Sequence, residues 1–125
     1  MRYLILIHSN PRSRALWETL TDEQRMEFGR GYMALSAEIE TAGEMVISNG
    51  LTDLALAKRV WVQDGETMTS DGPFAEVKEY VAGFLLLDTE TEEQALAWAA
   101  KTPDAQLGGA VEVRPLLDMS TLDLS

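Results

Sequence analysis

His8 is the only histidine in the chain, and a neutral imidazole can act as a general base near neutral pH. It follows an apolar run over residues 3–7 and so lies at the end of the first predicted strand, where a strand meets a cleft. Two interpretations of His8 stay open at this point. It is either a catalytic acid–base group or a histidine that hydrogen-bonds at a strand end.

Asp71 is the carboxylate whose position best suits work beside His8. It precedes Gly72 and Pro73, and because the proline ring fixes φ, the loop that carries the carboxylate is constrained. The carboxylate either orients His8 or binds a polar group of a substrate. Alternatively, it accepts hydrogen bonds from amides of its own loop, as in an Asx turn. His8 and Asp71 are therefore the predicted catalytic residues.

Three more residues are candidates for substrate binding. Phe74 and Glu79 follow Asp71 in the same segment, and Arg114 lies on the last predicted strand. Glu79 can flank a pocket as one of a pair of carboxylates, or it can be a solvated residue with weak local ion pairs. Arg114 shares a strand face with Glu112 and can hold a carboxylate through two parallel N–H bonds. A salt bridge between strands or subunits is the alternative for this pair.

Composition excludes several function classes. The formal net charge of −11 disfavours direct binding to nucleic acid or to an anionic membrane, because both need a basic surface. The chain has no cysteine, which removes disulfides and zinc–thiolate sites. One histidine and scattered carboxylates predict no metal site, and no glycine-rich phosphate loop or nucleotide fingerprint predicts a cofactor. The short basic clusters at Arg12/Arg14 and Lys58/Arg59 are most simply solvated surface.

The predicted elements alternate in the order β-α-β-hairpin-β-α-β. Thr21 with Gln24 forms the start of a long helix that ends at Gly43, and Thr91 starts a second helix that Pro103 closes. Asp64-Gly65 is a hairpin turn. Strands are expected at residues 1–8, 44–51, 57–63, 66–70, 80–87 and 110–114, and residues 12–20 are ambiguous between a helical turn and a loop.

This order predicts an α+β fold of the ferredoxin-like βαββαβ type, with an antiparallel sheet and two helices on one of its faces. Apolar residues occupy both parities of the strands at 3–7 and 84–87, so the second sheet face is also apolar. We therefore expect a second copy of the chain to pack its sheet there, which makes a homodimer. Aromatic residues could line a pocket but are more often core: Trp17, Trp61, Trp98, Tyr32, Tyr80 and Phe84.

The segment over residues 71–79, Asp-Gly-Pro-Phe-Ala-Glu-Val-Lys-Glu, is followed by Gly83-Phe84 and looks like the signature of the YCII-related family, in its DGPF-domain branch. Residues 1–7 and 109–115 resemble the same branch. The resemblance implies a dimeric α+β barrel over residues 1–116, related in shape to muconolactone isomerases and small monooxygenases. Residues 117–125 then form an acidic tail. The family has no firmly assigned reaction, although a His–Asp pair has been proposed as catalytic in YCII-related proteins.

Two functions follow as hypotheses. The first is a cofactor-independent enzyme that uses a His/Asp acid–base pair on a small molecule, for proton transfer, isomerisation or elimination. The second is a non-catalytic module that binds a ligand or a protein, and the resemblance links such a module to extracytoplasmic-function sigma factors. The apolar run at residues 3–7 is too short for a signal peptide or a membrane span, so a cytoplasmic protein is expected.

Overall fold

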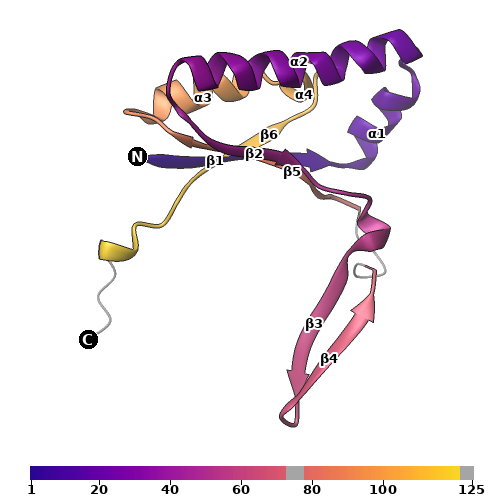
Figure 1. The fold of residues 1–125 in the computed structure, drawn as a ribbon. Helices are drawn as coiled ribbons and strands as arrows, with labels where there is room; N and C mark the ends of the chain where they lie inside the picture. Colours follow the sequence, from indigo (N-terminus) through magenta and orange to yellow (C-terminus); the bar gives the residue numbers. More distant parts are fainter. Residues whose placement is uncertain (73–77, 122–125) are drawn as a thin grey trace.

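Four antiparallel strands form the main sheet of the computed structural model, which describes residues 1–72 and 78–121 (Figure 1). β1 (Arg2–Ser9) and β5 (Tyr80–Asp88) lie in the middle, and β2 (Met45–Gly50) and β6 (Val111–Pro115) form the edges, in the order β2-β5-β1-β6. This order with antiparallel neighbours is the ferredoxin-like arrangement. The predicted α+β class is confirmed.

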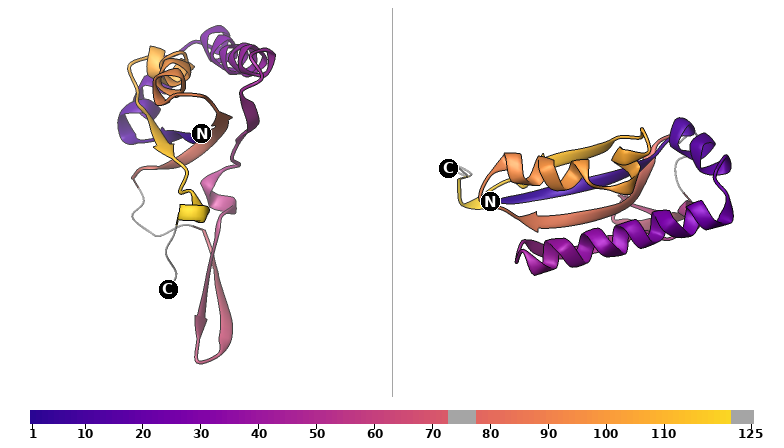
Figure 2. Two further views of the ribbon diagram at one scale, coloured as in Figure 1. Left: turned by 90° about the vertical axis from the view of Figure 1, so that its left-hand side faces the viewer. Right: turned by 90° about the horizontal axis from the view of Figure 1, so that it is seen from above.

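Helices cover one side of this sheet. The two longer ones are α2 (Asp22–Thr41) and α3 (Glu92–Ala100), and Figures 1 and 2 show both on the same side. α1 (Pro11–Glu18) follows β1, and α4 (Pro103–Gln106) follows α3. Two 3₁₀ turns, η1 (Leu54–Leu56) and η2 (Met119–Thr121), complete the described elements.

Side-chain caps set the helix starts. The predicted capping box of α2 is present. Thr21 Oγ1 accepts from the backbone N–H of Gln24 at 3.1 Å, and the backbone N–H of Thr21 donates to Oε1 of Gln24 at 2.8 Å. Asn10 caps α1 in the same way, which settles the ambiguous segment as a helix. α3 ends before Pro103 as expected, but another helix, which the sequence did not predict, begins at this proline. Thr102 caps a further short helix, and proline fits the first turn of α4 because its missing N–H has no partner there.

The core lies between the sheet and the helices. From the sheet, Ile5, Leu85 and Leu87 are fully buried or nearly so, and they alternate with residues that point to the other face. The helices contribute Leu35 and Ile39 from α2 and Trp98 and Ala99 from α3. The odd-numbered positions of β1 therefore face the helices, as do positions 83, 85 and 87 of β5.

No helix of the described chain covers the opposite face of the sheet, which carries even-numbered positions of β1, β5 and β6 and odd-numbered positions of β2. Strand register places its residues in two rows, one of Asn49, Phe84, Leu6 and Glu112 and one of Ile47, Leu86, Leu4 and Arg114. We refer to these two rows as the open face. Five of its eight residues are apolar, as predicted from the apolar residues at both odd and even positions of the strands at 3–7 and 84–87.

β3 (Lys58–Gln63) and β4 (Glu66–Asp71) form a separate two-stranded hairpin that projects from the body of the protein (Figures 1 and 2). Asp64 and Gly65 form its turn with φ of 50° and 78°, the conformation that a two-residue hairpin of this type requires. Val60 and Val62 alternate with Arg59, Trp61 and Gln63 as predicted, but the two valines are 65 % and 71 % exposed. The hairpin thus presents a valine face to solvent.

Gly31 and Gly29 provide a matched pair on α2 for a stability test. A Cβ at position 31 would lie 2.9 Å from Cγ of Pro103, whereas a Cβ at position 29 would meet nothing within 4 Å. Gly31→Ala is therefore expected to destabilise the fold by about 1–3 kcal/mol, because it overpacks the contact between α2 and α4. Gly29→Ala is expected to stabilise it by about 0.5–1 kcal/mol, since alanine has the higher helix propensity.

Urea unfolding of both variants beside the wild type measures the two effects. The difference in sign is the diagnostic result, because both substitutions make the same chemical change on the same helix. Equal stabilisation by both substitutions would show that α4 does not pack on Gly31.

Candidate functional site

His8 lies at the irregular end of β1, where the register against β5 shifts between Ile7 and His8. Its imidazole is half-buried and stands between two carboxylates. Nε2 is 3.2 Å from Oε1 of Glu112, and Nδ1 is 3.8 Å from Oε1 of Glu79. Nδ1 is buried and makes no hydrogen bond to the described residues.

The sheet itself brings Glu112 to His8. β6 pairs with β1 so that Glu112 lies opposite Leu6, two residues before His8 and on the same face. An ionised carboxylate only accepts hydrogen bonds, so Nε2 is the donor in the contact with Glu112. This contact orients the ring relative to β6.

The structure pairs Asp71 with Lys58. The Asp71 carboxylate is 90 % exposed at the base of the hairpin, where Nζ of Lys58 lies 2.5 Å from it. Among the described residues, no hydrogen bond or ion pair joins Asp71 to His8. The carboxylates that contact His8 within one protomer are Glu112 and Glu79.

The predicted binding residues have different surroundings. Glu79 contacts His8, as described above. Arg114 lies on the open face in the row next to Glu112, so the expected shared face of these two residues is confirmed. Phe74 lies outside the described residues.

A cavity of about 630 Å³ lies beside His8, between the ends of β1 and β5 and helices α1, α2 and α4. Three aromatic residues contribute to its wall, and the rings of Trp17 and Phe28 meet edge to face at 5.3 Å. Trp98, by contrast, is core, and Trp61 is on the hairpin. The wall of the cavity combines apolar, aromatic and charged residues: Ile7, His8, Ser9, Ser13, Arg14, Leu16, Trp17, Glu18, Phe28, Asp53, Tyr80, Ala82, Asp104, Leu107 and Gly109.

Asp104 and Tyr32 form a titratable pair at the cavity that the sequence did not reveal. The Tyr32 hydroxyl on α2 donates a hydrogen bond to Oδ2 of Asp104 on α4. Burial raises the pKa of the Asp104 carboxyl above its usual range, and the hydrogen bond from Tyr32 opposes part of that rise. Burial, together with the hydrogen bond to Asp104, also raises the pKa of Tyr32 well above its ordinary value.

Asp104→Asn is expected to change how stability depends on pH. A carboxyl whose pKa is raised by folding stabilises the fold fully below its ordinary pKa of 3.8, and this contribution is lost as the pH rises through the folded-state pKa. The amide does not titrate, so the free energy of unfolding of D104N relative to the wild type should rise between pH 4 and pH 8. Urea unfolding across that range measures it.

Tyr32→Phe serves as the companion variant. It removes the hydrogen bond that lowers the Asp104 pKa, so the variant should lose more stability relative to the wild type at pH 8 than at pH 4. Parallel pH profiles for D104N and the wild type would contradict this account of the pair.

The described parts of the chain contain neither a metal-binding cluster nor a membrane-spanning helix. Residues 1–72 and 78–121 contain no group of three or more histidine and carboxylate side chains arranged to hold a metal ion. No helix within those same ranges is both long and apolar enough to cross a membrane.

Comparison with known proteins agrees with this architecture. The chain has the fold of a solved structure, 5-chloro-2-hydroxyhydroquinone dehydrochlorinase (TftG) from Burkholderia phenoliruptrix AC1100 in complex with 2,5-dihydroxybenzoquinone, with a TM-score of 0.53 and 14 % sequence identity. The match covers 98 % of this chain and 100 % of TftG. At this identity, the likeness shows the fold alone.

The family model of the YCII-related domain matches residues 1–120, so the chain belongs to the YCII-related family. The chain is also 32 % identical over 117 residues to an "Uncharacterized protein R00369" of Rhizobium meliloti (strain 1021). That match covers 93 % of this chain and 92 % of the relative. The resemblance to the YCII-related family drawn from the sequence is confirmed.

Proposed function

We propose that this protein is a cofactor-independent enzyme that moves a proton on a small organic substrate, with His8 as the acid–base group. The observation that carries the proposal is the 3.2 Å contact between Nε2 of His8 and Oε1 of Glu112, on the half-buried ring of a residue that also lines the cavity. Because Asp71 contacts Lys58, the proposal gives Glu112 the orienting role that the sequence had assigned to Asp71.

The remaining groups have supporting roles. Glu79, 3.8 Å from Nδ1, is the charged group nearest to the nitrogen that accepts a proton. Arg114 places a positive charge on the same face as Glu112 and can bind a substrate carboxylate. Proton transfer, isomerisation and elimination all need one group that takes and returns a proton, and the structural neighbour TftG is a dehydrochlorinase.

A homodimer is part of the proposal. The open face carries Leu4, Leu6, Phe84, Leu86 and Ile47, which are exposed or half-buried in one protomer. A second sheet packed on this face would remove their apolar surface from water. It would also enclose His8, Glu112 and Arg114 between two copies of the chain.

His8→Gln tests the enzyme directly, because glutamine keeps a hydrogen-bonding side chain but cannot take up a proton near neutral pH. A panel of small hydroxyaromatic compounds and lactones supplies the substrates. With any compound that turns over, H8Q should lower kcat by about 100-fold or more, and Glu112→Gln by less. Unfolding midpoints for both variants control for folding. Full turnover by H8Q would remove the central residue of the proposal.

A second candidate function is a binding module whose contact element is the hairpin. The exposed valine face of β3 favours it, because isolated two-stranded hairpins gain stability by packing against another surface. An extracytoplasmic-function sigma factor is the partner that this alternative names. The test is a pull-down from cell extract at low salt, with Val62→Asp as the comparison. Capture of a sigma factor by the wild type but not by V62D would support the module, and equal capture by both would contradict it.

A further inference from the structure

Arg14 on α1 holds its guanidinium at the wall of the cavity through contacts with two other segments. Nη1 donates to Oγ of Ser9 at 2.9 Å, and Nη2 donates to the carbonyl oxygen of Lys78 at 2.7 Å. The guanidinium carbon lies 5.4 Å from the centre of the Tyr80 ring. Helix α1, the end of β1 and the start of β5 therefore fix the position of this cation together.

The charge of Arg14 has no carboxylate to balance it among the described residues. Its two hydrogen-bond acceptors, a hydroxyl and a carbonyl, are neutral. A guanidinium has five N–H donors, so these two bonds leave three that no described residue accepts. A half-buried cation of this kind is costly unless an anion joins it.

The acidic residues of the same cavity are each engaged elsewhere. Glu18 lies 3.8 Å from Arg25, Oδ1 of Asp53 accepts from the Ala55 amide at 2.9 Å, and Asp104 accepts from Tyr32. None of the three forms an ion pair with Arg14. The chain has a net charge of −11, yet no described carboxylate forms an ion pair with Arg14 in this cavity. This is the feature of the cavity that points to an anionic ligand.

The walls next to Arg14 suit a flat apolar body. Tyr80 stacks near the guanidinium, and Trp17 and Phe28 lie on the same wall. A volume of about 630 Å³ is in the range of small-molecule pockets. We infer that the cavity binds a planar organic anion of the aromatic carboxylate class, with its carboxylate on Arg14 and its ring among these aromatic side chains. This inference rests on the proposed function, because it names the class of substrate that would lie beside His8.

Benzoate and benzamide test the inference, because they share ring and size and differ in charge. Binding is measured as the rise in unfolding temperature and by calorimetry, in a buffer free of sulfate and phosphate, because a ligand that binds the native state stabilises it. Benzoate should bind the wild type and benzamide at least about tenfold more weakly, since a bond to a charged group is stronger than one to a neutral group.

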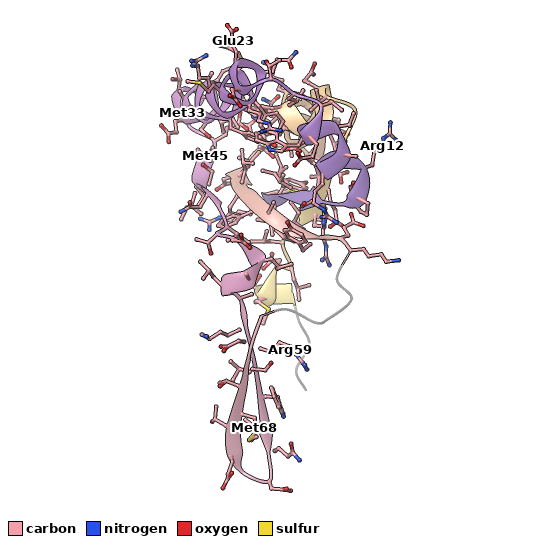
Figure 3. All side chains as sticks on the ribbon, turned by 90° about the vertical axis from the view of Figure 1, so that its right-hand side faces the viewer. Arg12, Glu23, Met33, Met45, Arg59 and Met68 are labelled. Carbon is pink, nitrogen blue, oxygen red and sulfur yellow. The ribbon has the colours of Figure 1, made fainter. Side chains whose placement is uncertain are left out.

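Arg14→Gln and Arg12→Gln form a matched pair on the same helix. Both remove one positive charge, but Arg12 is exposed and points away from the body of the protein (Figure 3). R14Q should weaken benzoate binding by at least about tenfold, whereas R12Q should leave it unchanged. Arg14→Lys keeps the charge without the planar fork and should give an intermediate affinity. It is the deciding variant if R14Q proves unfolded without ligand.

Each outcome decides the inference. Equal binding of benzoate and benzamide, equal loss in R12Q and R14Q, or stabilisation by sulfate as strong as by benzoate would overturn it. The fate of the proposed function is separate. Turnover that falls in H8Q but is unchanged in R14Q would overturn only the inference about the aromatic carboxylate. Arg14-dependent benzoate binding in a protein that turns over no compound in the panel would support an anion site and count against the enzyme.

Discussion

Leu6→Asp is expected to leave a folded monomer, whereas the wild type is expected to form the proposed dimer. Leu6 lies in the row of the open face between Phe84 and Glu112, away from the core on the helix side. In a monomer the aspartate would be solvated, so the fold should survive. In a dimer a second sheet would bury the charge without a partner, at a cost of several kcal/mol, which is enough to weaken association by about a thousandfold or more.

Sedimentation velocity over about a hundredfold range of protein concentration measures this change. Met33→Asp is the control, because Met33 is also apolar but is 75 % exposed on α2, on the helix side of the sheet. It should leave the sedimentation of the dimer unchanged. A wild type that stays monomeric at the highest concentration, or an L6D variant that associates as the wild type does, would refute the dimer.

Much of the local structure could be predicted because its causes lie within a few residues of one another. Thr21 and Gln24 define the start of α2, and Asp64-Gly65 defines the hairpin turn. Gly43 has a φ of 75° just after the last residue of α2 and its cap, as expected for a glycine that ends a helix. In each case, the side-chain cap or the glycine conformation that determines the structure involves only residues close together in the sequence.

Alternation along a strand, in contrast, reveals two faces but not what covers them. Val60 and Val62 share a face as predicted, yet no part of the described chain packs over it, because the hairpin is separate from the main sheet. Pro103 shows a similar limit. A proline after a helix is compatible with its end and equally with the first turn of the next helix, and the cap from Thr102 selects the second.

The sequence predicts His8 as a candidate site residue because it is the only histidine in the chain. Its carboxylate partner was not found, because Glu112 follows 104 residues later and only the β1–β6 register brings the two together. Tyr32 and Asp104 are 72 residues apart and meet only once α2 and α4 are packed. The sequence predicts Arg14 as solvated surface, whereas in the structure it lines the cavity. Charge alone does not show which side of a helix faces a cavity.

Ile5→Ala is expected to have the largest effect on stability of any substitution considered, a loss of about 2–5 kcal/mol. Ile5 is 0 % exposed and lies in the central strand between Leu85 on β5 and Val113 on β6. The substitution removes three methyl or methylene carbons from a site enclosed by the sheet and two helices, so the neighbours can collapse only partly into the space. The total free energy of unfolding of a domain of this size is about 5–15 kcal/mol, so the variant should unfold at a clearly lower urea concentration than the wild type.

The comparison with Val60→Ala isolates burial as the cause. Val60 is also a β-branched strand residue, but it is 65 % exposed, and its truncation should change the free energy of unfolding by no more than about 0.5 kcal/mol. Both variants are measured by urea unfolding at one fixed protein concentration, because association would add to apparent stability. Similar losses in the two variants would mean that the valine face is covered in solution. A loss below about 1 kcal/mol in I5A would mean that the core is not centred on β1.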